Sequence, residues 1–338
     1  MAAATEGHRR TPPRRGGGAQ STGDTPVREK FPMLKFTIRR IIHLIPTILG
    51  MMFILFTILY FTPGDPAIVA LGEEATPENI EQFHKEHGLD QPFFVQFFRY
   101  VGNALQGDLG YSYAAKSEVS KEVFPRVPTT MKLAFSAVLF STIFGIPLGI
   151  VCAIRQYSLI DTLATLFTLF GISTPTFWTG MLFIILFSVH LGWLPSMGFD
   201  TLSEMVLPVL TLSGTSMAII ARMTRSSMLE VIKADYIRTA RSKGQKESVI
   251  IFKHALPNAL IPIMTIIGIQ FGGLLGGSIV TEAIFSISGI GRLMIEAIKV
   301  RDYPIIQGGV LFVSIAFSLV NLVVDLLYAL VDPRIRMK

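Results

Sequence analysis

The sequence has little charge and almost no cysteine for a chain of 338 residues. Asp, Glu, Lys and Arg together make up 16% of it, whereas hydrophobic residues make up 50%. This composition is too apolar for an ordinary soluble domain. The single cysteine, Cys152, lies inside an apolar run, so the sequence predicts neither an internal disulfide framework nor a thiolate metal cluster.

Several catalytic and nucleotide-binding motifs are also missing. The chain has no Gly-x-x-x-x-Gly-Lys-Ser/Thr loop to hold phosphates, so any ATP must be hydrolysed by another chain. It has no Gly-x-Ser-x-Gly, no His-Glu-x-x-His and no paired aspartates in the middle of an apolar run, which argues against an intramembrane enzyme. The stretch Ser288–Arg292 resembles a nucleotide loop only superficially, because the Rossmann context is absent. We therefore expect no enzymatic activity, no cofactor and no metal.

Long apolar runs dominate the rest of the chain. A helix needs about 20 apolar residues to cross the hydrocarbon core of a bilayer. The runs free of Asp, Glu, Lys and Arg are 41–64, 133–154, 162–199, 205–221, 254–281 and 303–324. The third run is too long for one span, and we expect Ser173-Thr174-Pro175 to kink it. The sequence predicts an all-α membrane protein with about six transmembrane helices, and seven is the alternative.

The distribution of basic residues sets the predicted orientation. Nine Lys and Arg residues lie in 1–40 and eight in 222–253, whereas the loop 190–204 has none. Cytoplasmic loops of membrane proteins carry an excess of Lys and Arg. We therefore expect both termini and the segment 222–253 inside, and the formal charge of +6 does not indicate a nucleic-acid partner.

The chain divides into four predicted parts. Residues 1–32 are rich in Arg, Pro and Gly, which is typical of a disordered basic tail and here predicts a cytoplasmic one. Residues 33–127 hold the first membrane helix and an extracytoplasmic segment, in which Glu78–His87 and Phe93–Leu105 are predicted helices of a small cap. Residues 128–330 form the main membrane domain, and 331–338 form a cytoplasmic end.

Small residues within the runs predict close helix packing. Gly145 and Gly149 are four residues apart in the second run. The same spacing separates Gly272 from Gly276 and Gly273 from Gly277 in the fifth run. Such spacing lets two helix backbones approach closely.

Polar groups within the apolar runs are costly in a membrane and often functional. Glu282 follows the end of the fifth run and Asp325 that of the sixth, so both can also lie at an interface. The candidate pathway residues are Gln270, Glu282, Asn321 and Asp325. A self-sufficient secondary transporter often has charged pairs at mid-helix depth and two internal repeats, and neither is clear here.

One long polar segment, Asp235–Pro262, interrupts the apolar second half of the chain. Its spacing predicts two short helices, from about Leu229 to Lys243 and from about Gln245 to Leu256, before Pro257 starts a new helix. Gly244 stands where a helix C-cap favours a positive φ. Two short amphipathic helices fit a groove on a partner protein. The alternative is a cytoplasmic loop that is basic only because such loops are.

The same segment resembles the coupling loop of ABC importer permeases, which contacts the ATPase subunits. In that family the loop is written Glu-Ala-Ala, three residues, Gly, nine residues, Ile, any residue, Leu-Pro. Ala240 and Gly244 match in register, as do the later Leu and Pro, whereas Arg238 replaces the Glu and His254 the Ile. An ionic role of that Glu is therefore not expected at Arg238. The resemblance assigns to the ATPase-coupling loop the residues Asp235, Arg238, Thr239, Ala240, Gly244, Leu256 and Pro257.

Other stretches resemble the peptide and nickel branch of these permeases. They are Gly88–Pro92, Gly107–Ser112, Gly289–Pro304 and Asp332–Arg336, so that the resemblance covers about residues 33–338. It implies the ABC type I importer permease fold in a bacterial-type inner cell membrane.

The resemblance also implies a function. The chain would be a permease subunit that forms the transmembrane pathway for di- and oligopeptides. Its partners would be a second homologous permease subunit, two cytoplasmic ATPase subunits and an extracytoplasmic substrate-binding protein. Nickel, haem or glutathione is the alternative cargo, and ATP-independent secondary transport is the alternative mechanism.

Overall fold

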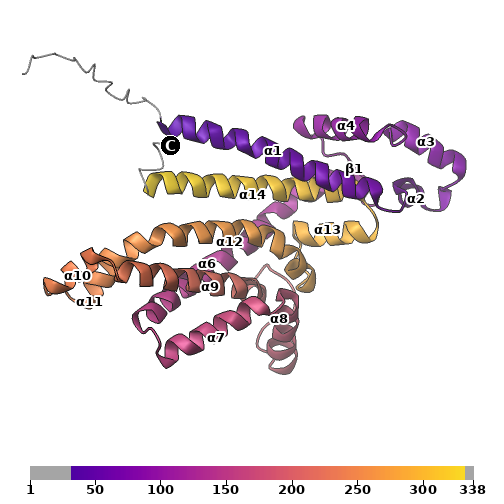
Figure 1. Ribbon diagram of the computed structural model, residues 1–338. Helices are drawn as coiled ribbons and strands as arrows, with labels where there is room; N and C mark the ends of the chain where they lie inside the picture. The colour runs from indigo at the N-terminus through magenta and orange to yellow at the C-terminus, as the bar shows by residue number, and fades with distance from the viewer. Residues whose placement is uncertain (1–31, 332–338) are drawn as a thin grey trace, which may run out of the picture.

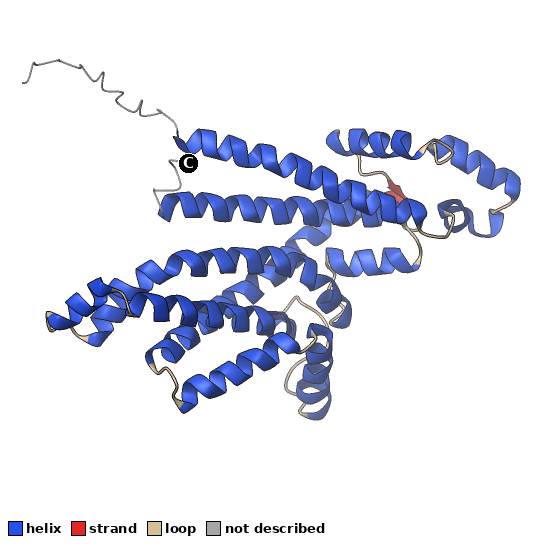
Figure 2. Cartoon of the chain, in the orientation of Figure 1, coloured by secondary structure: helices blue, strands red, loops and turns tan. Residues whose placement is uncertain are grey.

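A computed structural model describes residues 32–331 of the chain (Figure 1). The predicted tail, 1–32, lies outside the described residues except for Pro32, and the predicted end, 331–338, except for Val331. Helices make up most of the described chain, with one antiparallel pair of two-residue strands (Figure 2). The predicted all-α class is confirmed.

Five helices in this part of the chain are long and apolar enough to cross a membrane. They correspond to α1 (Pro32–Phe61), α6 (Val127–Ile154), α9 (Leu202–Ile232), α12 (Leu256–Ile284) and α14 (Tyr303–Val331). Each overlaps one predicted run and extends beyond at least one of its ends, although α1 ends at Phe61, three residues before the predicted end of its run. Charged residues that end a run need not end a helix, because long basic side chains can reach the interface while the backbone stays helical.

The third run is broken where the sequence predicts it. It forms α7 (Leu159–Ser173), α8 (Thr176–Phe183) and the π-helix η3 (Ile184–His190), with a bend of 104° at the break. Pro175 disfavours the helical conformation at the preceding residue, and Thr174 is extended, with φ −87° and ψ 127°. Counted as one broken span, this pair brings the total to six.

The core lies where α6, α9 and α12 meet. The helix α6 packs along α9, and α12 packs against α6, α9 and α14 (Figure 1). Leu133, Leu207 and Phe285 are buried in the largest apolar cluster, each 1% exposed or less. By contrast, α1 packs on α14 but leaves large apolar side chains such as Phe61 exposed. Lipid or another membrane subunit is what covers an apolar surface of this kind.

The glycines of α6 and α12 behave differently. A Cβ atom added at Gly149 would lie 2.5 Å from Ala221 O, so this glycine allows α6 to approach α9, as predicted. A Cβ at Gly272 would lie 2.8 Å from the Phe317 ring of α14. Three further glycines of α12 have nothing within 4 Å, so no described element of this chain packs closely on them, and their role in packing stays a prediction: Gly273, Gly276 and Gly277. They lie on a face of α12 that no described element covers.

The outer segment forms a small helical cap. Its elements are α2 (Pro66–Leu71), the 3₁₀-helix η1 (Gly72–Glu74), α3 (Pro77–His87), α4 (Phe93–Leu105), β1 (Tyr111–Ser112), β2 (Ser117–Glu118), α5 (Val119–Val123) and the 3₁₀-helix η2 (Phe124–Arg126). The two predicted cap helices correspond to α3 and α4. Thr76 caps α3 by accepting a hydrogen bond from Asn79 N at 3.3 Å. Phe97 fixes α4 to α1, with its ring centroid 5.3 Å from that of Phe53 and 5.6 Å from that of Phe56.

The remaining elements lie at the two ends of the bundle. They are α10 (Asp235–Ser242), α11 (Glu247–Val249), the π-helix η4 (Ile250–Ala255) and α13 (Ile290–Lys299). The helices α10 and α11 lie at one end of the molecule, and α2, α3 and α4 lie at the other (Figure 1). The first turns of α1 and the last turns of α14 lie toward the end that carries α10 (Figure 1).

Candidate functional site

The polar segment folds differently from the prediction at both of its helices. The first helix begins at Asp235 and not near Leu229, because α9 continues to Ile232 before Ala234 becomes extended, with φ −65° and ψ 149°. The second is not a separate helix, since α11 and η4 run on into α12 from Glu247. Pro257 therefore does not start a new helix, and the wider turns of η4 before it absorb the missing backbone hydrogen bond.

The turn between α10 and α11 is a Schellman motif. Gly244 has φ +75°, so the predicted positive φ is confirmed. Gly244 N donates to Arg241 O at 2.9 Å, and Gln245 N donates to Ala240 O at 3.4 Å. These two bonds and a glycine at C′ define the motif. A Cβ at Gly244 would meet nothing within 4 Å, so the backbone conformation alone favours glycine here.

The apolar side of α10 is fixed to the membrane helices. Ile237 is fully buried in a cluster that includes Ile150 of α6, Met228 of α9 and Ala259 of α12. Ala240 and Leu256, two of the motif residues, pack against the same cluster. The apolar side of α10 is thus packed tightly against the ends of three membrane helices.

The other side of α10 is polar and exposed. The side chains of Asp235 and Arg238 are 99% and 73% exposed and lie 3.8 Å apart, and such a pair contributes little to stability. Thr239 Oγ1 donates to Asp235 O at 3.0 Å. Arg241 donates from Nε and Nη2 to the two carboxylate oxygens of Glu247, at 2.7 and 3.2 Å, and so bridges the turn. This bond raises the pKa of Arg241 above its ordinary value. The exposed face of α10 is thus charged, and hydrogen bonds within the same segment fix its conformation.

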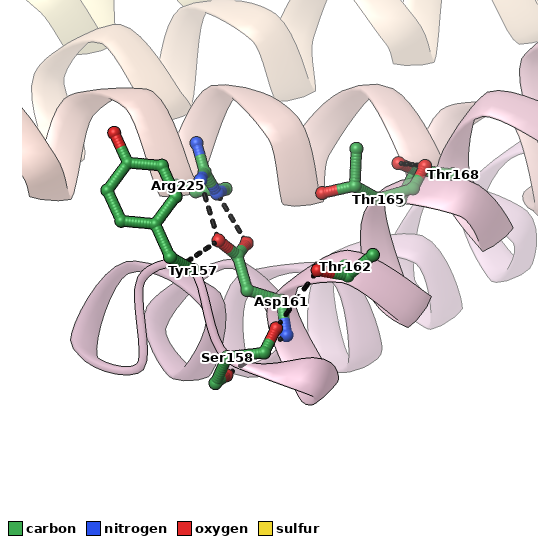
Figure 3. A network of polar contacts seen from close by, with 7 residues as sticks. All are labelled: Tyr157, Ser158, Asp161, Thr162, Thr165, Thr168 and Arg225. Carbon is green, nitrogen blue, oxygen red and sulfur yellow. Dashed lines mark hydrogen bonds and ion pairs between the residues drawn. The ribbon is translucent and has the colours of Figure 1, made fainter.

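The sequence analysis did not predict an ion pair that lies between the first turn of α7 and the last turns of α9. Asp161 of α7 accepts two hydrogen bonds from Arg225 of α9, from Nε at 2.7 Å and from Nη2 at 2.8 Å (Figure 3). Tyr157 N also donates to Asp161 Oδ2 at 2.9 Å. The pair joins the loop between α6 and α7 to the last turns of α9, which lead into α10. The sequence did contain a signal for this ion pair. Asp161 and Arg225 carry opposite charges and lie near the ends of two apolar runs, on the same predicted side of the membrane.

Replacing Asp161 by alanine is expected to destabilise the protein by about 3 kcal/mol, because Arg225 then loses its partner. The expected loss lies at the lower end of the range for buried pairs, since the side chain of Asp161 is 5% exposed but that of Arg225 is 29% exposed. The apparent melting temperature of the detergent-solubilised protein measures the effect. Glu81→Ala, which breaks an exposed pair with Lys85, is the control and should change little. Equal melting temperatures for both variants would contradict a clamping role.

The structure does not bring the four candidate pathway residues together. Gln270 Nε2 donates to Ser216 Oγ at 3.0 Å, near the middle of α12 and α9. Glu282 lies twelve residues further along α12, about 18 Å away. Asn321 is half-buried on α14. Asp325 forms an ion pair of 2.9 Å with Arg40, which joins the inner end of α14 to α1.

Glu282 has its partners inside the protein. It is fully buried, and its Oε1 accepts a hydrogen bond from Thr130 Oγ1 at 2.8 Å. Its Oε2 accepts from Gly291 N at 2.7 Å and from Arg292 N at 3.2 Å, at the start of α13. A carboxyl group in this position satisfies amides that a helix N-terminus leaves unpaired. This burial does not fit the predicted pathway role and gives Glu282 a structural one.

The same contact explains the glycines around it. A Cβ at Gly289 would lie 2.2 Å from Glu282 Oε2, and one at Gly291 would lie 2.4 Å from Ile279 Cα. The Gly-x-Gly stretch therefore makes room for the Glu282 carboxyl group. Because the amides of Gly291 and Arg292 already bind that carboxyl group, the stretch is not a nucleotide loop.

These features define the class of the protein. Apolar helices cross the membrane several times, a two-helix polar loop lies at one end and a cap lies at the other, which is the architecture of a multi-pass membrane permease. The chain belongs to the family of binding-protein-dependent transport system inner membrane components, whose model matches residues 145–337. The model of the N-terminal part of such membrane components matches residues 33–134. The predicted family and membrane location are confirmed.

Curated relatives cover most of the chain. It is 43% identical over 332 residues to the dipeptide transport system permease protein DppB of Alkalihalophilus pseudofirmus, with 90% of this chain and 100% of the relative covered. It is 44% identical over 306 residues to the glutathione transport system permease protein GsiC of Escherichia coli, again with 90% and 100% covered.

Solved structures support the fold. The inward-facing MetNI methionine ABC transporter superposes with a TM-score of 0.54 at 21% sequence identity, covering 62% of this chain and 95% of that chain. A second crystal form of the same transporter gives a TM-score of 0.51, with 62% and 96% covered. At this identity the likeness concerns the fold alone. The predicted importer permease fold is confirmed.

Proposed function

We propose that this chain is one of two membrane subunits of an ABC importer for di- and oligopeptides. The curated relatives are permeases for dipeptides and for glutathione, which is itself a tripeptide. Short peptides are therefore the cargo that both relatives support, and glutathione is one member of that class. Nickel, haem and ATP-independent transport have no comparable support.

The observation that carries the proposal is the Schellman turn of α10. It exposes the charged face of α10 while Ile237 fixes the opposite face to α6, α9 and α12. An ATPase subunit that binds this face and moves on ATP binding would displace α10 as a rigid body. The inner ends of the three helices would follow, and the pathway would change from inward to outward access.

The remaining partners follow from this arrangement. Two ATPase subunits would bind the coupling loops of this chain and of a second, homologous permease subunit. A substrate-binding protein would dock on the cap at the other end of the molecule. The proposed parts are a first helix with cap, 33–127, and a main permease domain, 128–330. The family matches to 33–134 and 145–337 support this division. Gln270, Asn321 and Asp325 remain the candidate pathway residues.

Reconstitution tests the proposed function. The complete complex in proteoliposomes, supplied with ATP and binding protein, is expected to take up a labelled tripeptide, and unlabelled di- and tripeptides should compete. The purified chain alone should show no ATPase activity above a detergent blank, because it has no phosphate loop. Uptake of nickel or haem in place of peptides would overturn the peptide cargo. Robust ATPase turnover by this chain alone would contradict the proposal that separate subunits hydrolyse the ATP.

The proposed orientation makes a separate prediction. With both termini and α10 inside, residue 243 should be protected in sealed cells and residue 116 accessible to an impermeant thiol reagent. Lys243→Cys and Lys116→Cys in a Cys152→Ala background provide the two labelling positions. Labelling of residue 243 from outside, with residue 116 protected, would reverse the orientation.

A further inference from the structure

The outer segment borders a partly open cavity that the proposed coupling mechanism does not use. Its volume is about 470 Å³, within the range of about 300–1,000 Å³ that is usual for small-molecule sites. It lies between the last turns of α1, the cap and the first turns of α14. These elements meet at the end of the molecule opposite α10 (Figure 1). We call this space the cap cavity.

Aromatic side chains form much of the wall of the cap cavity. Tyr60, Tyr100, Tyr113 and Tyr303 all line it. Burial raises the pKa of Tyr100 above its ordinary value, and burial together with the Asp302 carboxylate raises the pKa of Tyr113 to about 12. These two phenols are therefore neutral at physiological pH. The faces of such rings bind apolar groups and also attract cations.

Two buried polar atoms have no hydrogen-bond partner within residues 32–331, one on a residue of the cavity wall and one on the residue that precedes it in the chain. They are Tyr303 Oη and Asp302 Oδ1. Asp302 is 4% exposed, and its other oxygen accepts a hydrogen bond from Ser112 Oγ. Buried hydroxyl and carboxylate groups normally have partners, because leaving them without one is unfavourable. Tyr303 lines the cap cavity, and its covered hydroxyl group can gain a partner from a ligand there once the atoms that cover it move aside.

The wall also carries charges of both signs. Asp65 Oδ1 accepts hydrogen bonds from Ala67 N at 2.9 Å and from His84 Nε2 at 2.8 Å. Asp108 Oδ1 accepts from Gly110 N at 2.9 Å, and the second oxygen of this carboxylate is available to a ligand. Arg99 donates from Nη1 to a backbone carbonyl at 3.3 Å, and a guanidinium group has five N–H donors in all. Carboxylates and a guanidinium group around aromatic rings match a ligand with an ammonium group, a carboxylate and an apolar body.

We propose that the cap cavity binds short zwitterionic peptides outside the membrane, before they enter the pathway. The ammonium group of the peptide lies among the carboxylate of Asp108 and the tyrosine rings, and its carboxylate accepts hydrogen bonds from Arg99. Tyr303 Oη hydrogen-bonds to the peptide backbone. This inference rests on the proposed peptide cargo and adds a receiving site on the permease itself, distinct from the binding protein.

Equilibrium binding to the assembled complex tests the inference. The permease pair with its ATPase subunits, in lipid nanodiscs without nucleotide or binding protein, is titrated with tritium-labelled alanyl-phenylalanyl-alanine. Saturable binding is expected. Acetylating the amino group of the probe or amidating its carboxyl group should each weaken binding about tenfold, because each removes one charge-assisted interaction.

Variants assign the two ends of the probe. Arg99→Gln should weaken binding of the free acid about tenfold and leave binding of the amide almost unchanged, because the amide has no carboxylate for Arg99. Asp108→Asn should weaken binding of the probe with a free amino group about tenfold and leave binding of the acetylated probe almost unchanged. Tyr303→Phe removes only the hydroxyl group that lacks a partner, so it should weaken binding without lowering the melting temperature. Lys121→Gln, an exposed cation of the same segment that is paired with Glu118, is the matched control and should have no effect.

Each other outcome overturns the inference. Absence of saturable binding does so, as does an equal effect of Arg99→Gln on the acid and the amide, or unchanged binding by Tyr303→Phe. The same peptide is also tested for uptake by the complete complex with binding protein and ATP. Normal uptake without binding in the cap cavity leaves the proposed function standing and removes only the receiving site. No uptake of any peptide removes the proposed function itself.

Discussion

Replacing Gly244 by valine is expected to reduce substrate uptake about 5- to 30-fold while the protein is still inserted and still binds its permease partner. At φ +75° a β-branched side chain is strained by about 1–2 kcal/mol, which lowers the ratio of the docking-competent turn to competing conformations by this factor. In the proposed coupling, the strained turn would no longer hold α10 at the angle that a groove on the ATPase requires. Uptake of labelled peptide at matched expression measures the effect, and the ATPase subunits should detach or lose their substrate-stimulated activity.

A variant at a second glycine tests whether the loss of uptake comes from lost coupling or from backbone strain alone. Gly192 has φ +63° and, like Gly244, nothing within 4 Å of an added Cβ, but it lies after η3 and far from α10 in the chain. Gly192→Val should therefore produce similar local strain with little loss of coupling. Gly244→Ala should be milder than Gly244→Val. Normal uptake by Gly244→Val, or a larger effect from neutralising Arg238, Arg241 and Lys243 together, would favour a loop that is merely basic.

Replacing Glu282 by alanine is expected to destabilise the protein by about 3 kcal/mol or more. The variant loses the acceptor of Thr130 Oγ1, Gly291 N and Arg292 N, and burial keeps water from replacing it. The start of α13 and the outer end of α12 should loosen together. The apparent melting temperature in detergent and the protease sensitivity of the outer loop measure the loss.

Conservative variants test whether Glu282 acts as a cap. Thr130→Ser keeps the hydroxyl group and should be nearly neutral, whereas Thr130→Val removes it at similar volume and should destabilise by about 1–3 kcal/mol. Glu296→Ala, a change at an exposed carboxylate of α13, is the control. If Glu282→Ala has the melting temperature of the unchanged protein but fails in transport, the carboxyl group acts in the pathway and the predicted pathway role returns.

In the polar segment, the local sequence pattern predicts the end of α10 correctly but not its start. The sequence predicts Gly244 at the end of a helix because it follows the helical spacing that runs to about Lys243, where a C-cap favours a positive φ. The two hydrogen bonds of a Schellman turn are present there. The start of that helix was predicted six residues too early, because the apolar spacing of Leu229–Ile232 continues the pattern of α9 without a break. Helix boundaries depend on which neighbour a residue packs against, and periodicity alone does not contain that information.

By itself the sequence determined the membrane class, the six apolar runs and the break at Pro175, because the bilayer imposes a fixed apolar length and proline restricts its neighbour locally. It also determined the family, because the coupling motif is contiguous. Only the tertiary structure decided which charges meet. Asp161 and Arg225 are 64 residues apart, and Thr130 and Glu282 are 152 apart. Partners at such separations are chosen by how helices pack around a common core, which residue spacing along one chain does not specify.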